Sequence, residues 1–211
     1  MASSRIVVIS RRWVWLLLAA AVVAAGLVGW RLGWWPASAR ATAIYVYDPQ
    51  GFIAEEQRPG SCWTGSLAAP RAGAFRCASD NVIYDPCFVT AGNAVACPRG
   101  NPAENRGVLL LLTDPLPGPP DAWQNPPDPA NPSPWFVVLA GGGECGVLTG
   151  TRPPEYPLGC ALPGGVQGTV CSLPAPLAGD PRLYAVLCGG WDPSSQRLTD
   201  PEIRGVEEMW I

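Results

Sequence analysis

Eight cysteines constrain this chain more than any other feature of its sequence. They are Cys62, Cys77, Cys87, Cys97, Cys145, Cys160, Cys171 and Cys188. A zinc site needs closely spaced pairs such as C-x-x-C, and the chain has none, so we predict no metal site and no cofactor. In an exported chain, an even number of cysteines at these spacings indicates a disulfide framework.

Eight cysteines allow 105 pairings. The economical hypothesis joins sequence neighbours, which gives the pairs Cys62–Cys77, Cys87–Cys97, Cys145–Cys160 and Cys171–Cys188. Each such bond closes a short loop and stabilises the fold by roughly 3 kcal/mol in the chain-entropy model. Four bonds of this size rival the net stability of a small domain, so we expect reduction to unfold it.

The amino-terminal residues predict export. A tail at 1–12 carries three arginines, and residues 13–30 are uncharged and apolar, with tryptophans at both ends. As a helix, 13–30 would span about 27 Å, close to a bilayer core. The arginine bias favours a cytoplasmic tail, a signal-anchor helix at 13–30, a linker at 31–42 and an extracytoplasmic domain at 43–211.

Two other export routes stay open. Ala37-Ser38-Ala39 offers the small residues of a signal-peptide cleavage site, which would release a secreted protein. Ser10-Arg11-Arg12 loosely fits a twin-arginine signal. The domain lies outside the cytoplasm by every route.

Composition excludes several chemistries. All 14 basic residues are arginine, and without histidine there is no Ser-His-Asp triad, no Cys-His pair and no imidazole metal ligand. From residue 42 onward, 9 arginines face 17 acidic residues, a net charge of −8. That charge argues against a nucleic-acid partner.

The 25 prolines and 24 glycines favour short strands joined by turns. We therefore predict a mainly β fold, a small disulfide-rich antiparallel β domain behind one transmembrane helix. Expected strands are 43–47, 73–77, 82–84, 108–112 (central, buried on both faces), 135–140, 183–188 and a closing strand at 202–211. Expected turns are 48–51, Asp85-Pro86 and Gly92-Asn93. The proline-rich segment 114–134 predicts an extended loop, pinned by Trp123.

One glycine motif suggests a nucleotide and is rejected. Gly141, Gly143 and Gly146 match G-x-G-x-x-G directly after a predicted strand. The dinucleotide fingerprint requires a following helix, but the chain continues through Gly150 to Pro153-Pro154. We expect a hairpin at 135–149 and no nucleotide partner.

The cysteine block resembles an uncharacterised, exported, cysteine-rich bacterial domain. The resemblance rests on Cys62, Ser66, Arg71, Phe75-Arg76-Cys77, Ile83-Tyr84-Asp85-Pro86-Cys87-Phe88 and Cys97-Pro98, with Cys145, Thr149-Gly150-Thr151 and Cys160 further on. It covers roughly residues 60–160. Such domains are membrane-anchored or secreted, sometimes beside receptor-like kinases, and have no established activity. The resemblance implies export and the disulfide framework, without catalytic residues.

The candidate ligand-binding residues are Trp63, Arg71, Arg76 and Asp85. Arginine forks with an aromatic ring suit an anionic or sugar ligand. The structural alternative, which we favour, is an Arg76–Asp85 ion pair that fixes the chain before Cys87, with Trp63 and Phe88 packed on the neighbouring disulfides.

We hypothesise a non-catalytic membrane-anchored interaction or sensing module with an envelope protein or glycan as partner. One alternative is a cell-wall carbohydrate hydrolase with two carboxylates drawn from Asp80, Asp85, Glu144 and Glu155. Another is a structural accessory subunit of a membrane complex.

Overall fold

The computed structural model describes residues 40–118, 125–164 and 168–211, in which strands dominate and the only helical element is a single 3-10 turn, η1 (Pro102–Glu104). Residues 41–211 form one compact unit. The mainly β, disulfide-rich prediction is confirmed. The predicted tail (1–12), signal-anchor helix (13–30), most of the linker (31–42) and Trp123 lie outside the described residues. No helix within the described part is long and apolar enough to cross a membrane.

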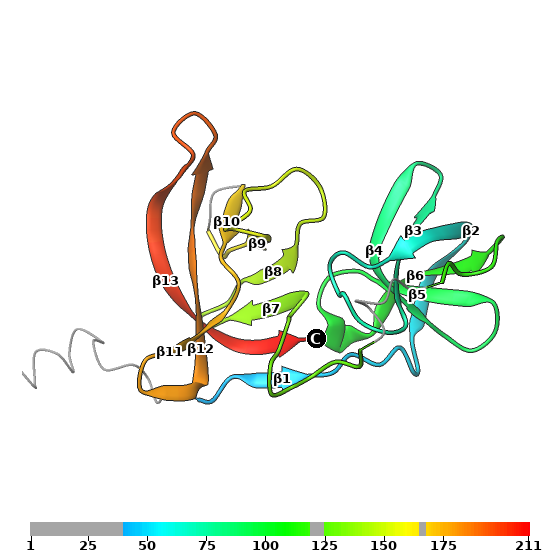
Figure 1. The fold of residues 1–211 in the computed structure, drawn as a ribbon, viewed down its shortest axis with the longest axis horizontal. Coiled ribbons are helices and arrows are strands. Elements are labelled where there is room, and N and C mark those ends of the chain that lie inside the picture. Colours follow the sequence, from blue (N-terminus) through cyan, green and yellow to red (C-terminus); the bar gives the residue numbers. More distant parts are fainter. Residues whose placement is uncertain (1–39, 119–124, 165–167) are drawn as a thin grey trace, which may run out of the picture. The chain divides into compact units, whose positions relative to one another are not determined.

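The first half of the unit is a closed barrel of five strands (Figure 1). Its strands are β2 (Ile53–Gly65), β3 (Ala74–Ser79), β4 (Val82–Val89), β5 (Ala94–Pro98) and β6 (Arg106–Leu112). Each strand pairs antiparallel with the next, but β2 and β6 close the barrel in parallel. An odd number of up-and-down strands leaves the first and last running the same way, so this seam departs from the predicted antiparallel pairing, which the other barrel strands follow.

The second half closes by the same principle with six strands, which we call the ring. They are β7 (Phe136–Leu139), β8 (Glu144–Val147), β9 (Leu158–Ala161), β10 (Thr169–Cys171), β12 (Asp180–Asp192) and β13 (Arg197–Trp210). Pairing runs β7–β8–β9–β10–β12, and β13 bonds to both β12 and β7. Every one of these pairings is antiparallel, since six is even. The long β12–β13 hairpin is drawn in orange and red in Figure 1.

Two short strands extend the ring. β1 (Ala43–Tyr45) pairs in parallel with the end of β13, and β11 (Ala175–Leu177) pairs antiparallel with β12. The predicted closing strand at 202–211 is confirmed as the second part of β13, and the predicted hairpin at 135–149 is confirmed as β7–β8.

Four disulfides tie neighbouring strands, and the predicted neighbour pairing is confirmed for all of them. Cys62–Cys77 joins β2 to β3, and Cys87–Cys97 joins β4 to β5 within the barrel. In the ring, Cys145–Cys160 joins β8 to β9, and Cys171–Cys188 joins β10 to β12. Each half thus carries two cross-strand bonds beside its own apolar core.

Strand β6 corrects the prediction of a strand buried on both faces. Val108 and Leu110 are fully buried in the barrel core, whereas Leu111 is 47% exposed. In a barrel, alternate side chains point inward and outward, and here solvent covers the outer side of Leu111. The uninterrupted apolar sequence of residues 108–112 therefore belongs to a strand with only one buried face.

A third apolar cluster connects the two halves. Tyr47 packs against Phe88 of the barrel and against Trp135, which precedes strand β7 of the six-stranded ring. The aromatic centroid of Tyr47 lies 4.7 Å from that of Phe88 and 5.6 Å from that of Trp135. Phe88 is 2% exposed and belongs to this cluster. The prediction that Phe88 packs on the neighbouring disulfide is therefore wrong, because its side chain packs against Tyr47 and Trp135 instead.

Candidate functional site

Register shifts on three adjacent strands bring Trp63, Arg76 and Asp85 together. Between Cys62 and Thr64, β2 carries one residue more than β3, and that residue is Trp63. One strand further, Arg76 of β3 faces two residues of β4, Asp85 and Pro86. Bulges of this kind bend a strand and redirect its side chains, and they are frequent next to functional sites.

The same feature corrects the predicted turn at Asp85-Pro86. Strand β4 continues through both residues to Val89, and the peptide bond between them is cis. The predicted turn at Gly92-Asn93 is confirmed, because the β4–β5 hairpin reverses there. Proline in a sheet is tolerated at a bulge, where no ladder donor is required.

The Asp85 carboxylate is the buried centre of the site. Its side chain is 1% exposed and accepts hydrogen bonds from the Ser66 hydroxyl (2.5 Å) and from the N–H groups of Leu67 (3.2 Å) and Ala68 (3.4 Å). The Arg76 guanidinium lies 3.4 Å away as the counter-charge. The predicted ion pair is therefore present, and it also orders the loop after β2.

Two opposing influences act on this carboxyl group. Burial raises the pKa of Asp85 above its ordinary value, while the hydrogen bonds from Ser66, Leu67 and Ala68 and the charge of Arg76 lower it in part. Because burial prevails, ionised Asp85 depends on Arg76, and loss of that cation would leave a charge in a poorly solvated place.

Arg76 connects the buried carboxylate to the surface. Its Nη1 donates both to Asp85 and to the backbone oxygen of Thr149 in the loop after β8, at 3.3 Å. Its guanidinium lies over the Trp63 ring, 5.8 Å from the centroid. Neither Nε nor Nη2 of Arg76 has a hydrogen-bond partner within the described residues, and the side chain is 13% exposed.

Trp63 is not a core residue. It is 49% exposed, so the prediction that it packs on the neighbouring disulfide is wrong. Cys62 turns inward to its disulfide, and the next side chain along the strand must point out. Leu67, whose backbone N–H donates to Asp85, is also exposed, at 47%.

Arg71 lies in different surroundings from the other three candidates. It stacks on the Phe88 ring at 4.7 Å and donates from Nη2 to the backbone oxygen of Tyr47 at 2.8 Å. Burial lowers the pKa of Arg71. It also borders a pocket of about 150 Å³ shared with Asn125 and Asp128 of the proline-rich segment. These contacts give Arg71 a structural role at the junction of the two halves.

The four carboxylates of the hydrolase hypothesis occupy separate surroundings. Asp85 is held by Arg76, Asp80 lies 3.8 Å from an arginine of β2, and Glu144 accepts a hydrogen bond from Asn101 at 3.0 Å. Glu155 is exposed. No contact within the described residues joins any two of them into a pair.

Two members of the site were not predicted as site residues. Ser66 is fully buried and links the carboxylate to the backbone N–H of Ala69, and Thr149 contributes its carbonyl oxygen. Both positions belong to the motifs that carry the family resemblance, which was the available signal. Comparison with protein-family models, curated proteins and solved structures found no match.

Proposed function

We propose that this protein is a membrane-anchored, extracytoplasmic binding module without catalytic activity. Its ligand is an envelope protein or an envelope glycan, and it binds at the surface formed by Trp63 and Arg76. The apolar segment 13–30 serves as the single-pass anchor, with the unit at 41–211 outside the membrane. The four disulfides support the extracytoplasmic location, because such bonds persist in oxidising compartments.

The observation that carries the proposal is an exposed aromatic ring on a rigid polar support. Trp63 is 49% exposed, and Arg76 beneath it is oriented by Asp85 and by the Thr149 carbonyl. A fixed tryptophan and arginine lose little conformational freedom on binding, and these two residue types are enriched among the residues that dominate binding energies. The ring offers an apolar face, and the guanidinium offers donors to hydroxyl or carboxylate groups.

The alternatives have less support. A hydrolase with two carboxylates needs the pair about 5–10 Å apart across a cleft. Asp85 is already held by Arg76 and three further donors, which removes the strongest acid candidate. A structural accessory subunit of a membrane complex is the second alternative, and it predicts binding that does not depend on Trp63.

The test is capture of partners from detergent-solubilised membranes of the source cell, with the tagged full-length protein as bait. A parallel sedimentation assay with purified cell-wall glycan covers the second ligand class. We expect Trp63→Ala to reduce binding of the partner or the glycan by more than tenfold, the typical effect of truncating a central tryptophan.

The matched control is Ile203→Ala, since Ile203 is an apolar side chain of β13 that is 72% exposed. It should bind like the wild type. Equal binding by Trp63→Ala would reject the proposed surface. Absence of both a stoichiometric protein and a bound glycan would reject the binding function itself.

A further inference from the structure

The two disulfides of the ring touch each other. The Sγ atoms of Cys160 and Cys171 are 2.9 Å apart although they belong to different bonds, Cys145–Cys160 and Cys171–Cys188. The sulfurs of Cys145, Cys160 and Cys171 all lie within 4.8 Å of one another. The four cysteines lie on strands that are neighbours in the ring, and the contact between Cys160 and Cys171 joins the two disulfides into one cluster of sulfur atoms.

The barrel has the same number of disulfides without this arrangement. All four of its cysteines are described, and no three of their sulfurs meet within the same distance. Burial does not distinguish the two sets, because Cys77 and Cys87 are fully buried in the barrel core as Cys145 and Cys171 are in the core of the six-stranded ring. The sulfur contact is thus a property of the ring, and the barrel provides an internal control.

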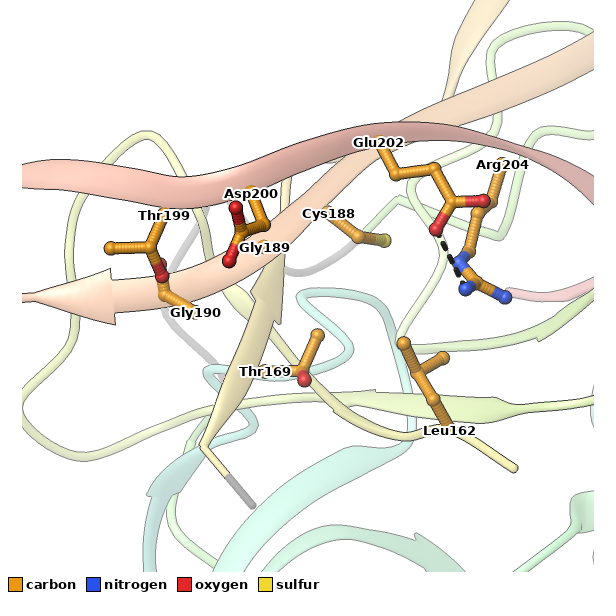
Figure 2. Close-up of a pocket in the computed structure, with 9 residues that line it drawn as sticks. All are labelled: Leu162, Thr169, Cys188, Gly189, Gly190, Thr199, Asp200, Glu202 and Arg204. Carbon is orange, nitrogen blue, oxygen red and sulfur yellow. Dashed lines mark hydrogen bonds and ion pairs between the residues drawn. The ribbon is translucent and has the colours of Figure 1, made fainter. Parts of the chain in front are cut away.

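Cys188, at one end of this cluster, lines a pocket open to solvent. The pocket has a volume of about 190 Å³ and is lined by Cys188 and two glycines of β12, with Asp200 and Glu202 on the adjacent strand β13 (Figure 2). Gly189 and Gly190 present no side chains that would narrow the approach to Cys188. Cys188 is 2% exposed and Cys171 is fully buried, so the pocket wall at Cys188 is the place where a small molecule comes nearest to the Cys171–Cys188 bond.

We propose that the ring is a thiol–disulfide exchange site at which a small thiol shifts the cross-links from one strand pair to another. The thiolate attacks Sγ of Cys188 and forms a mixed disulfide there. The Cys171–Cys188 bond breaks, and its electron pair leaves on Sγ of Cys171.

The second step is internal. The Cys171 thiolate attacks Sγ of Cys160, a Cys160–Cys171 bond forms, and the Cys145–Cys160 bond breaks with its electron pair on Cys145. Cys145 takes up the proton that the incoming thiol lost, so the exchange needs no oxidant. The 2.9 Å separation meets the distance that such an attack requires, about 3–3.5 Å, and the Cys171 sulfur has only to move into line with the Cys145–Cys160 bond.

The pocket selects the charge of the thiol. Glu202 is paired with Arg204 at 2.8 Å, whereas Asp200 has no ion-pair partner within the described residues, which leaves the lining with a net negative charge. A cationic thiol is attracted and an anionic one repelled. One unit charge at about 4 Å in water changes the interaction by about 1 kcal/mol, which is roughly a five-fold effect on rate.

The shift changes which strands are cross-linked. Before exchange, β12 is tied to β10 and β8 is tied to β9. Afterwards only β9 and β10 are joined, so β8 and the β12–β13 hairpin keep hydrogen bonds alone. The β12–β13 hairpin is therefore the part of the ring that loses its covalent attachment when a thiol reacts.

The test is limited exchange of the full-length protein, followed by acid quenching, alkylation of free thiols and mapping of disulfide-linked peptides by mass spectrometry. The probes are cysteamine (cationic), 2-mercaptoethanol (neutral) and 2-mercaptoethanesulfonate (anionic). We expect an early species with the probe on Cys188, a Cys160–Cys171 link and alkylated Cys145, while both barrel disulfides stay intact.

Cysteamine should react at least about five-fold faster than the sulfonate at low ionic strength. Asp200→Asn should reduce this ratio toward the one that the two probes show with an uncharged small disulfide, and the matched control Asp180→Asn, whose residue lies on β12 but does not line the pocket, should preserve it. The same ratio in wild type and Asp200→Asn would overturn the route through the pocket.

A second variant tests the internal step without an added thiol. Cys188→Ser leaves Cys171 without its partner, and we expect a Cys160–Cys171 bond with Cys145 free. Cys97→Ser in the barrel is the control and should leave Cys62–Cys77 unchanged. The proposal is overturned if Cys145–Cys160 persists while Cys171 is alkylated, or if a barrel disulfide opens first in the wild type.

Discussion

Arg76→Met should destabilise this protein in a pH-dependent way. The substitution keeps most of the side chain's length and removes the cation that faces Asp85 at 3.4 Å. The carboxylate is 1% exposed and cannot regain its lost partner from water. Removing one member of a buried pair costs more than the pair contributes, because the other charge is left uncompensated.

The magnitude follows from the contacts that survive. Loss of one partner of a buried pair typically costs about 3–5 kcal/mol. Asp85 keeps the Ser66 hydroxyl and two backbone N–H donors, so the charge penalty falls to about 2 kcal/mol. Loss of the guanidinium over Trp63 adds roughly 0.5–1 kcal/mol. We expect about 3 kcal/mol at pH 7.

The pH dependence has a definite sign. Burial already holds the folded-state pKa of Asp85 above its unfolded value of 3.8, and Arg76 opposes that shift. Without Arg76 the folded pKa rises further. A carboxyl group of this kind contributes most stability below its unfolded pKa and loses it as pH rises through the folded pKa. The cost of Arg76→Met should therefore shrink to about 1 kcal/mol near pH 3, where Asp85 is protonated in both states.

Urea unfolding with the disulfides intact measures this prediction. For a slope of about 2 kcal/mol per M, 3 kcal/mol lowers the midpoint by about 1.5 M at pH 7. The control Arg58→Met removes an exposed partner of Glu56 and should change stability by at most about 1 kcal/mol at either pH. A cost for Arg76→Met that is constant with pH, or no larger than that of Arg58→Met, would refute the reasoning.

Two further substitutions test the packing of the barrel and its junction with the ring. Tyr47→Phe removes the 2.8 Å hydrogen bond from a 3% exposed phenol to the side-chain oxygen of Asn105 and should cost about 1 kcal/mol in the same urea assay. Gly107→Ala would place a Cβ atom 2.4 Å from the backbone oxygen of Cys97 at a φ of 152°, so we expect a loss above about 3 kcal/mol or no folded protein. Gly118→Ala meets nothing within 4 Å and should stay within about 0.5 kcal/mol of the wild type by thermal unfolding.

The parts of the fold that were predictable depend on local signals. Sequence-neighbouring cysteines on adjacent strands of a meander must come close, so the economical pairing of all eight is the structural one. Hairpins with glycine at the reversal, at 92–93 and 141–143, were recognised for the same reason. Glycine-containing turns and short disulfide loops each involve about ten neighbouring residues, so both can be recognised directly in the sequence.

The candidate site depends on register, which the sequence shows poorly. Trp63 was expected in the core because it adjoins a cysteine, and Asp85-Pro86 was expected in a turn because the dipeptide favours one. Two bulges place both residues within strands and direct Trp63 outward. A bulge is set by how two or three strands fit against each other, so a single strand's sequence does not reveal it.

Strand number explains the parallel seam at which the barrel closes. Five strands in the barrel require the parallel β2–β6 pairing, and β2 was not predicted as a strand at all. Its first half, from Ile53 to Arg58, alternates exposed and partly buried residues around two glutamates and carries no strong apolar pattern. Its place is fixed by closure with β6, whose residues 108–112 are all apolar, rather than by its own propensity. The polar half of β2 can stay exposed because the Cys62–Cys77 bond anchors the other half, immediately beside Trp63 and the buried Asp85 carboxylate. The Cys62–Cys77 disulfide and Trp63 of the candidate binding surface therefore lie on the same strand, at adjacent residues.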